Sequence, residues 1–453
     1  MIIPITQENN KCHSIHQLFV QLSGTRQFIL IGGLAVWTII PLVGIIFLLL
    51  YCQINISANQ IAGRKTSLPN LLPLLIVLFT ISTYIASFKS FNDTEVYLNI
   101  YWWLKYDPVF SFPNVGMEPV SFILLKYISM LTQGDELSFL FTQSLTMNIA
   151  FTAYSRIFLP EFYPLIILIN VMSQGYYFQL FWMRQLYSFI FIVPAIYTDI
   201  LVFRAILLYI ALFTHSSSLI YVFTLTTKII NSIISSASNF LAIFLRGVSK
   251  NIRFRLSLIA ISFLILISLY EILNIFLGAF ISSSDTADKL SNSNYYGASA
   301  SDFNQENYSL RNQIRTVLDY LIISIFAFNA DFARTNAVFF RWLLVFFTML
   351  FIYIGAYTFG LSMRMNSFFF CLPGFFYTIP LYSGKLDGSI NLYTYLFLFS
   401  IGFRIFYFIA SLILSNGSES YLTFWDGEAL TTPIGSYIHL FWKFLIEGWF
   451  GLK

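Results

Sequence analysis

Long apolar segments separated by short polar ones make up almost the whole chain. A helix needs about 20 apolar residues to cross a hydrocarbon core about 30 Å thick. Nine segments have this character: 28–51, 69–88, 138–158, 217–244, 256–280, 338–360, 367–384, 391–414 and 434–450. Five others are shorter or interrupted: 119–132, 162–178, 185–200, 203–214 and 316–330. The pattern predicts about 11–14 membrane-embedded helices, some of them half-spans.

The predicted fold class is an all-α, polytopic integral membrane protein, because continuous apolar runs indicate helices that satisfy their own backbone in lipid. The segment 28–51 is too long for a signal-peptide core and lacks a small-residue cleavage site, so we expect a retained first span. The expected organisation is a polar N-terminal tail, 1–27, and one multi-span membrane domain, 28–450. Within that domain, 281–315 is expected to be a long polar loop on the outer side of the membrane.

Composition excludes several classes of protein. Hydrophobic residues make up 57% of the chain and charged residues 10%, whereas a soluble domain carries about 25% charged residues. The net charge of +4 is too small and too dispersed to indicate a nucleic-acid partner. Cys12, Cys52 and Cys371 lack metal-ligand spacing, and the chain has neither a Walker loop nor an HExxH motif. We therefore expect no metal and no nucleotide cofactor.

The distribution of basic residues predicts the orientation in the membrane. The stretch 246–255 carries four positive charges and no negative one, which indicates the cytoplasmic side. One span earlier, His215 then lies on the outer side, and one span later so does the loop 281–315.

Two short helices would bring Arg184 to the same outer face as His215, if their connecting turn near 199–204 is cytoplasmic. The loop that ends at Glu118 shares this face if 119–132 is re-entrant, and does not if 119–132 crosses completely. Both possibilities are open at the level of the sequence.

Four ionisable residues at the ends of apolar segments mark the candidate site: Asp93, Glu118, Arg184 and His215. All of them lie within 89–217. An unpaired charge in hydrocarbon costs several kcal/mol, so such residues in membrane proteins commonly mark functional sites.

The two acidic residues are candidates for a general base. Asp93 precedes Tyr97 and the pair Trp102 and Trp103, a combination that suits sugar binding but also an ordinary interfacial aromatic belt. Glu118 precedes a proline, so it is either a functional carboxylate or only the cap of a helix that begins there.

The basic residues are candidates for anion binding. Arg184, followed by Gln185, presents a fork that matches phosphate oxygens, or it extends to lipid headgroups. His215, followed by Ser216 and Ser217, is a proton acceptor or phosphate partner, or it lies beside a serine helix cap.

Further along the chain, Arg364 precedes Asn366. Arg364 is either a second hydrogen-bond donor to a phosphate group or a charge between helices. Arg311 and Arg315, at the end of 281–315, either reach an anionic headgroup or are the ordinary positive flanks of a span.

Taken in order, these elements resemble the EpsG-like family of bacterial polysaccharide polymerases, which are related in role to the O-antigen polymerases. The resemblance extends over 70–385. The matching elements are Asp93…Tyr97, Glu118-Pro119, Arg184-Gln185, His215-Ser216-Ser217 and Arg364-Met365-Asn366.

The resemblance implies an enzyme of the bacterial inner membrane whose active site faces the periplasm. It would join oligosaccharide repeat units carried on undecaprenyl diphosphate into O-antigen, capsule or a related surface polysaccharide. The reaction is glycosyl transfer with a lipid-diphosphate leaving group, and no cofactor is required. A chain-length regulator is the implied protein partner.

The site residues follow from this scheme. Preorganised positive charge stabilises the departing diphosphate, and the candidates for this role are Arg184, Arg364 and Arg311. The candidate catalytic residues are Asp93, Glu118 and His215. The candidate glycan-binding residues are Tyr97 and Gln185, together with the tyrosines of 281–315.

Two other interpretations stay open. A flippase or transporter of the same lipid-linked oligosaccharide would have a similar length, but its charges are expected near the bilayer midplane on broken helices. Another membrane glycan transferase or an acyltransferase would use His215 as its central base. The position of the charges at helix ends favours chemistry at an interface.

Overall fold

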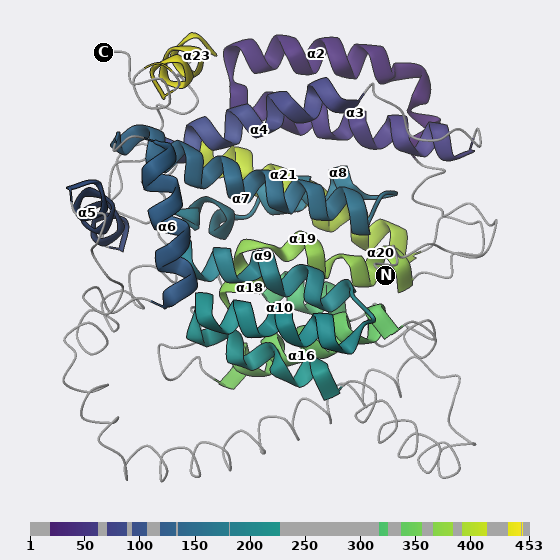
Figure 1. The fold of residues 1–453 in the computed structure, drawn as a ribbon. Coiled ribbons are helices and arrows are strands. Elements are labelled where there is room, and N and C mark those ends of the chain that lie inside the picture. The colour runs from purple at the N-terminus through teal and green to yellow at the C-terminus, as the bar shows by residue number, and fades with distance from the viewer. Residues whose placement is uncertain are drawn as a thin grey trace, which may run out of the picture.

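The computed structural model describes residues 19–61, 70–87, 93–106, 118–132, 135–180, 182–226, 317–324, 337–355, 366–383, 392–414, 434–444 and 446. All regular elements in this part of the chain are helices, and they stack in layers (Figure 1). The predicted all-α class is confirmed for these residues. The expected loop 281–315, the basic stretch 246–255 and most of the tail 1–27 lie outside the described residues.

The first layer contains α2 (Arg26–Ile39), α3 (Pro41–Ile61) and α4 (Leu71–Ala86), preceded by η1 (Ser23–Thr25). The expectation of one span over 28–51 is wrong, because the chain turns at Ile40 and α2 packs against α3. A residue before proline avoids the helical region, and Ile40 adopts φ −133° and ψ 82°. The two helices are so close that a Cβ atom at Gly44 would lie 2.4 Å from the Cα of Trp37.

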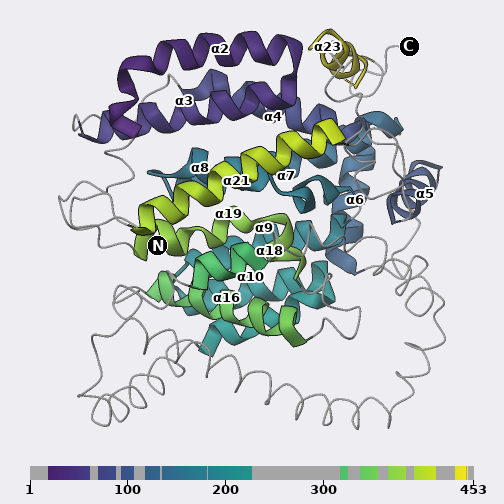
Figure 2. The same ribbon diagram turned by 180° about the vertical axis from the view of Figure 1, so that it is seen from behind.

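The centre of the bundle contains α7 (Glu136–Phe158) and α8 (Tyr163–Val171). All nine residues of α8 are buried, as expected for a helix that is apolar all round. Seen from behind, α21 (Leu392–Leu414) runs diagonally across the bundle (Figure 2).

A helical hairpin lies on the side opposite α2. It consists of α9 (Met183–Tyr197) and α10 (Leu201–Thr214), and η4 (Gln174–Gln179) leads into it from α8. The 3₁₀ helix η5 (Ser216–Thr226) and α16 (Ala337–Gly355) pack against this hairpin. The expected hairpin, with its turn near 199–204, is confirmed.

The expected single span over 367–384 is wrong, because prolines divide it. The segment forms three short helices, α18 (Ser367–Cys371), α19 (Pro373–Phe376) and α20 (Thr378–Ser383). A proline interrupts a helix because it lacks a backbone donor and clashes with the preceding turn. The segment packs on α8, where the backbone N–H of Gly374 donates to Asn170 Oδ1 at 2.8 Å. A Cβ atom at Gly374 would lie 2.3 Å from the carbonyl oxygen of Ile166, so only glycine fits.

At one end of the bundle, α6 (Pro119–Leu131) lies crosswise to α9 and α10 in both views (Figures 1 and 2). Ser121 Oγ donates to the carbonyl oxygen of Thr214 at 2.6 Å and ties α6 to the end of α10. Next to α6 lies α5 (Asp93–Tyr106), and α23 (Ile434–Lys443) packs against α4. The crosswise position of α6 brings its first residues to the ends of α9 and α10.

Among the described helices, one is long and apolar enough to cross a membrane by itself, over Pro41–Gln60 with a mean hydropathy of 1.9. Five further apolar helical stretches are shorter than a full span: Leu71–Ala86, Pro119–Leu131, Leu201–Thr214, Ala337–Leu350 and Phe397–Ala410.

Candidate functional site

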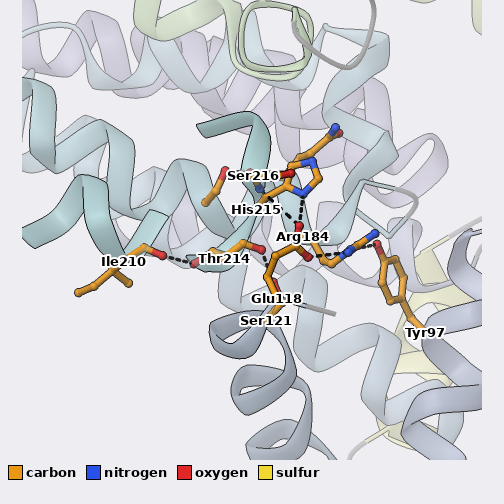
Figure 3. A network of polar contacts seen from close by, with 10 residues as sticks. Tyr97, Glu118, Ser121, Arg184, Ile210, Thr214, His215 and Ser216 are labelled. Carbon is orange, nitrogen blue, oxygen red and sulfur yellow. Dashed lines mark hydrogen bonds and ion pairs between the residues drawn. The ribbon is translucent and has the colours of Figure 1, made fainter. Parts of the chain in front are cut away.

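Four of the residues predicted from the sequence meet at the end of the bundle where α6 begins (Figure 3). Glu118 lies at their centre. Arg184 NH1 contacts Glu118 Oε2 at 2.6 Å, and His215 Nδ1 contacts Glu118 Oε1 at 3.1 Å. Arg184 Nε donates to the hydroxyl of Tyr97 at 3.1 Å. Residues from α5, α6, α9 and the end of α10 therefore form one polar cluster.

The start of α6 presents Glu118 to its partners. Pro119 begins the helix, as the sequence predicts, and Glu118 is extended at φ −64° and ψ 139°. Glu118 is the N-cap residue of α6, as one interpretation of the sequence predicted, but its side chain makes no capping hydrogen bond, so capping is not its only role. The carboxylate instead binds groups that lie 66 and 97 residues further along the chain.

The hairpin brings Arg184 and His215 together. Arg184 is the second residue of α9, and His215 directly follows α10. His215 is extended, with φ −160° and ψ 127°, which ends the helix and turns the following backbone toward Glu118. The backbone N–H of Ser216 consequently donates to Glu118 Oε1 at 3.3 Å. The sequence did not single out this donor, because any residue supplies a backbone N–H.

The cluster is partly buried, so solvent and a ligand can reach it. The side chains of Arg184, Glu118 and His215 are 30%, 21% and 16% exposed. Arg184 is held on two of its nitrogens by protein groups, and its guanidinium carbon lies 6.0 Å from the centre of the Tyr97 ring. These contacts fix the direction of the guanidinium, unlike those of an arginine that only extends to lipid headgroups.

Electrostatics keeps Glu118 ionised. Burial by itself raises the pKa of this carboxyl, but the hydrogen bond with His215 and the positive charge of Arg184 outweigh burial and lower the pKa from 4.5 to about 2. Because an ionised carboxylate only accepts hydrogen bonds, His215 Nδ1 must be the donor in its contact with Glu118.

Of the other predicted site residues, Gln185 is described in full, Asp93 only in its backbone, and Arg311 and Arg364 not at all. Gln185 is buried in α9 next to Arg184, and its Oε1 has no hydrogen-bond partner among the described residues. Asp93 begins α5, the helix that carries Tyr97, but its side chain lies outside the description. Arg311 and Arg364 lie outside the described residues altogether.

The structure contains a second charged cluster that the sequence did not predict. Arg404 of α21 pairs with Asp319, which is buried in the helix 317–324. The Tyr377 hydroxyl donates to Asp319 Oδ1 at 2.9 Å. The signal in the sequence was an arginine in the middle of an apolar segment, which is costly unless it is paired.

A buried polar network lies between α4, α7 and η4. Asn148 donates to Ser82 Oγ at 2.9 Å, and its Oδ1 accepts from Tyr176 and Gln179 at 2.7 and 2.8 Å. Because α9 begins four residues after Gln179, this network fixes the segment that leads to Arg184.

No group of three His, Cys, Asp or Glu side chains is arranged as metal ligands within the part of the chain that the structure describes. No protein-family model, no curated protein and no solved structure matches the chain. A function must therefore be inferred from the chemistry of the site.

Proposed function

We propose that this protein is a polytopic inner-membrane polymerase that joins lipid-diphosphate-linked oligosaccharide units into a surface polysaccharide. The observation that carries the proposal is the convergence of Arg184, Glu118 and His215 from three separate segments. One cation for an anionic leaving group and one acid–base pair are the groups that such a glycosyl transfer needs.

The membrane setting is supported by composition and by the exposed surfaces of the helices. Phe28 of α2, Val202 of α10 and Phe406 of α21 are 79%, 68% and 70% exposed. Contact of such side chains with water is unfavourable, whereas lipid accepts them.

The crosswise position of α6 (Figure 1) supports the re-entrant alternative for 119–132, which keeps Glu118 on the same outer side as Arg184 and His215.

In the proposed reaction, Arg184 faces the diphosphate of the donor. A hydroxyl oxygen of the acceptor sugar forms a bond to the anomeric carbon, and the bond from that carbon to the diphosphate oxygen breaks. The electron pair stays on the diphosphate oxygen, whose growing negative charge the guanidinium stabilises. The hydroxyl proton passes to a base of the protein.

His215 is the base that the geometry favours. Its Nδ1 donates to Glu118, so a neutral imidazole keeps its lone pair on Nε2 and can accept the proton there. Glu118, with a pKa of about 2, is a poor base at neutral pH and serves to orient the imidazole. Asp93, the other predicted base, stays a prediction.

A flippase of the same lipid-linked oligosaccharide is the second candidate, and one observation favours it. Arg404 and Asp319 form a buried ion pair inside the bundle, away from the ends of α21, where a transporter would place a coupling group. The polymerase is preferred because the accessible cluster combines a cation with an oriented histidine.

The two functions are separated by surface polysaccharide from a strain that lacks the gene, resolved on a gel. Loss of the polymer ladder with a single repeat unit retained supports a polymerase. Loss of even the single unit, with lipid-linked repeats trapped in the cytoplasmic leaflet, contradicts it and favours the flippase.

Complementation then tests the site. Wild type should restore the ladder and Glu118→Gln should not, at equal amounts in the membrane. Glu136→Gln is the matched control, because Glu136 is an exposed residue of α7, and it should restore the full ladder.

A further inference from the structure

The two oxygens of the Glu118 carboxylate have different partners. Oε1 accepts from His215 Nδ1 at 3.1 Å and from the backbone N–H of Ser216 at 3.3 Å. Oε2 accepts from Arg184 NH1 at 2.6 Å. The same carboxylate therefore orients the histidine with one oxygen and occupies the guanidinium with the other (Figure 3).

We propose that Glu118 Oε2 occupies the position of a phosphate oxygen of the donor and is exchanged for it on binding. The ligand is a diphosphate group, and its site is the NH1 edge of Arg184. Before the donor binds, Glu118 is an internal competitor for this edge. The inference rests on the proposed function for the identity of the donor but not for the exchange itself.

The chemistry of the two anions supports this exchange. Carboxylate and phosphate oxygens bind a guanidinium with the same charge-assisted geometry, so one can replace the other. The 2.6 Å contact lies between side chains that are 30% and 21% exposed. A ligand can reach a pair of this exposure, and a diphosphate carries more negative charge than a carboxylate, so it can displace Oε2 from the guanidinium.

The attachment of the guanidinium allows the exchange without loss of its position. Arg184 Nε keeps its hydrogen bond to Tyr97, and Oε1 keeps both of its donors. The histidine therefore stays oriented while the NH1 edge becomes available, so donor binding does not disturb the base.

The test is a binding measurement on the purified full-length chain in nanodiscs of neutral phosphatidylcholine, with inorganic pyrophosphate as the probe. Glu118→Gln removes the charge of the competitor and should tighten pyrophosphate binding about fivefold. The control Glu136→Gln should bind as wild type does. The double variant Glu118→Gln/Arg184→Ala should bind no better than Arg184→Ala.

Two results overturn the exchange. One is unchanged or weaker binding by Glu118→Gln, including the absence of measurable binding in all variants. The other is a gain that persists without Arg184, which would mean a general charge effect. If Glu118→Gln does not fold, Glu118→Asp replaces it, because its shorter side chain withdraws the carboxylate from Arg184 and should give a smaller gain.

A bilayer headgroup is a second source of the same phosphate chemistry. Repeating the measurement in nanodiscs that contain phosphatidylglycerol should leave the gain of Glu118→Gln in place. Abolition of pyrophosphate binding by this lipid would assign the edge to a headgroup and overturn the diphosphate assignment. Since the binding assay needs no polymer, its failure and the failure of the ladder experiment are distinguishable.

Discussion

Each end of the α9–α10 hairpin contains an arginine, Arg204 at the turn end and Arg184 at the other end, and these two arginines bind different kinds of acceptor. At the turn end, Arg204 donates to the carbonyl oxygens of Thr198 and Thr224 at 2.7 and 3.2 Å. Arg341 donates to the Thr198 carbonyl oxygen and to Asp199 Oδ1, both at 2.6 Å.

At the other end, about 20 Å away along the 15 residues of α9, the contacts of Arg184 with other described residues are made by side chains. Its partners are the carboxylate of Glu118 and the hydroxyl of Tyr97. Arg204 and Arg341 are 5% and 1% exposed, whereas the side chain of Arg184 is 30% exposed. Backbone carbonyl oxygens cannot give up Arg204 without unfolding the turn, but the Glu118 carboxylate can give up its contact with Arg184 and keep its other donors. The turn end, with Arg204, is therefore a structural site, whereas the end with Arg184 is a site where a ligand can replace a protein acceptor; we call them the structural end and the exchangeable end.

The largest effect should come from removing the cation at the exchangeable end. Arg184→Ala should lower the rate of polymer formation by about 100-fold to 1000-fold, because one preorganised donor to a developing oxyanion is lost. The melting temperature should fall less than for a fully buried arginine, because Glu118 loses one partner but keeps His215 and the N–H of Ser216. Ladder intensity over time, at matched membrane levels, measures the rate. Arg26→Ala, at the exposed start of α2, is the control, and an active Arg184→Ala protein would contradict the assigned role.

At the structural end, a substitution should lower stability and leave the activity of each folded molecule unchanged. Arg204→Ala removes buried hydrogen bonds from a charged donor and should reduce the free energy of unfolding by about 3 kcal/mol. Thermal unfolding of the purified protein and its yield in the membrane measure this loss. The folded fraction should keep normal activity per molecule. A stable but inactive Arg204→Ala variant would mean that Arg204, like Arg184, has a role in the reaction and not only in stability.

A smaller effect is expected from the hydroxyl that orients Arg184. Tyr97→Phe keeps the ring beside the guanidinium but removes the acceptor for Nε, and should slow polymer formation about fivefold. Tyr101→Phe is the matched control on the same helix, because the Tyr101 hydroxyl donates to the carbonyl oxygen of Asp135 instead. Equal rates for the two variants would remove Tyr97 from the site.

The smallest effect is a dependence of stability on pH. The pKa of Glu118 is about 2 in the folded protein and 4.5 ordinarily, so ionised Glu118 stabilises the fold above about pH 4.5 and loses this contribution as the pH falls toward 2. The difference in melting temperature between wild type and Glu118→Gln should shrink as the pH falls from about 4.5 to about 3. A constant difference down to about pH 3 would contradict the lowered pKa.

The sequence predicted the candidate site better than it predicted the helix boundaries. Glu118, Arg184 and His215 were recognisable because an unpaired charge at the end of an apolar segment has a high free-energy cost, so such a residue commonly marks a functional site. The breaks at Ile40 and Pro373 were missed, because apolar composition alone does not say where a long run bends. Arg404 was missed because its partner, Asp319, lies 85 residues away.

By itself, the sequence determined the helical class, the hairpin between Arg184 and His215, and the residues worth testing. These depend on local properties: the length of apolar runs, proline at a helix start, and the cost of charge near lipid. Only the tertiary structure decided that Glu118, besides being the N-cap residue of α6, is the shared partner of Arg184 and His215, and that the N–H of Ser216 joins it. Such pairings depend on how α6 lies across the ends of α9 and α10, a contact between distant segments that no local pattern encodes.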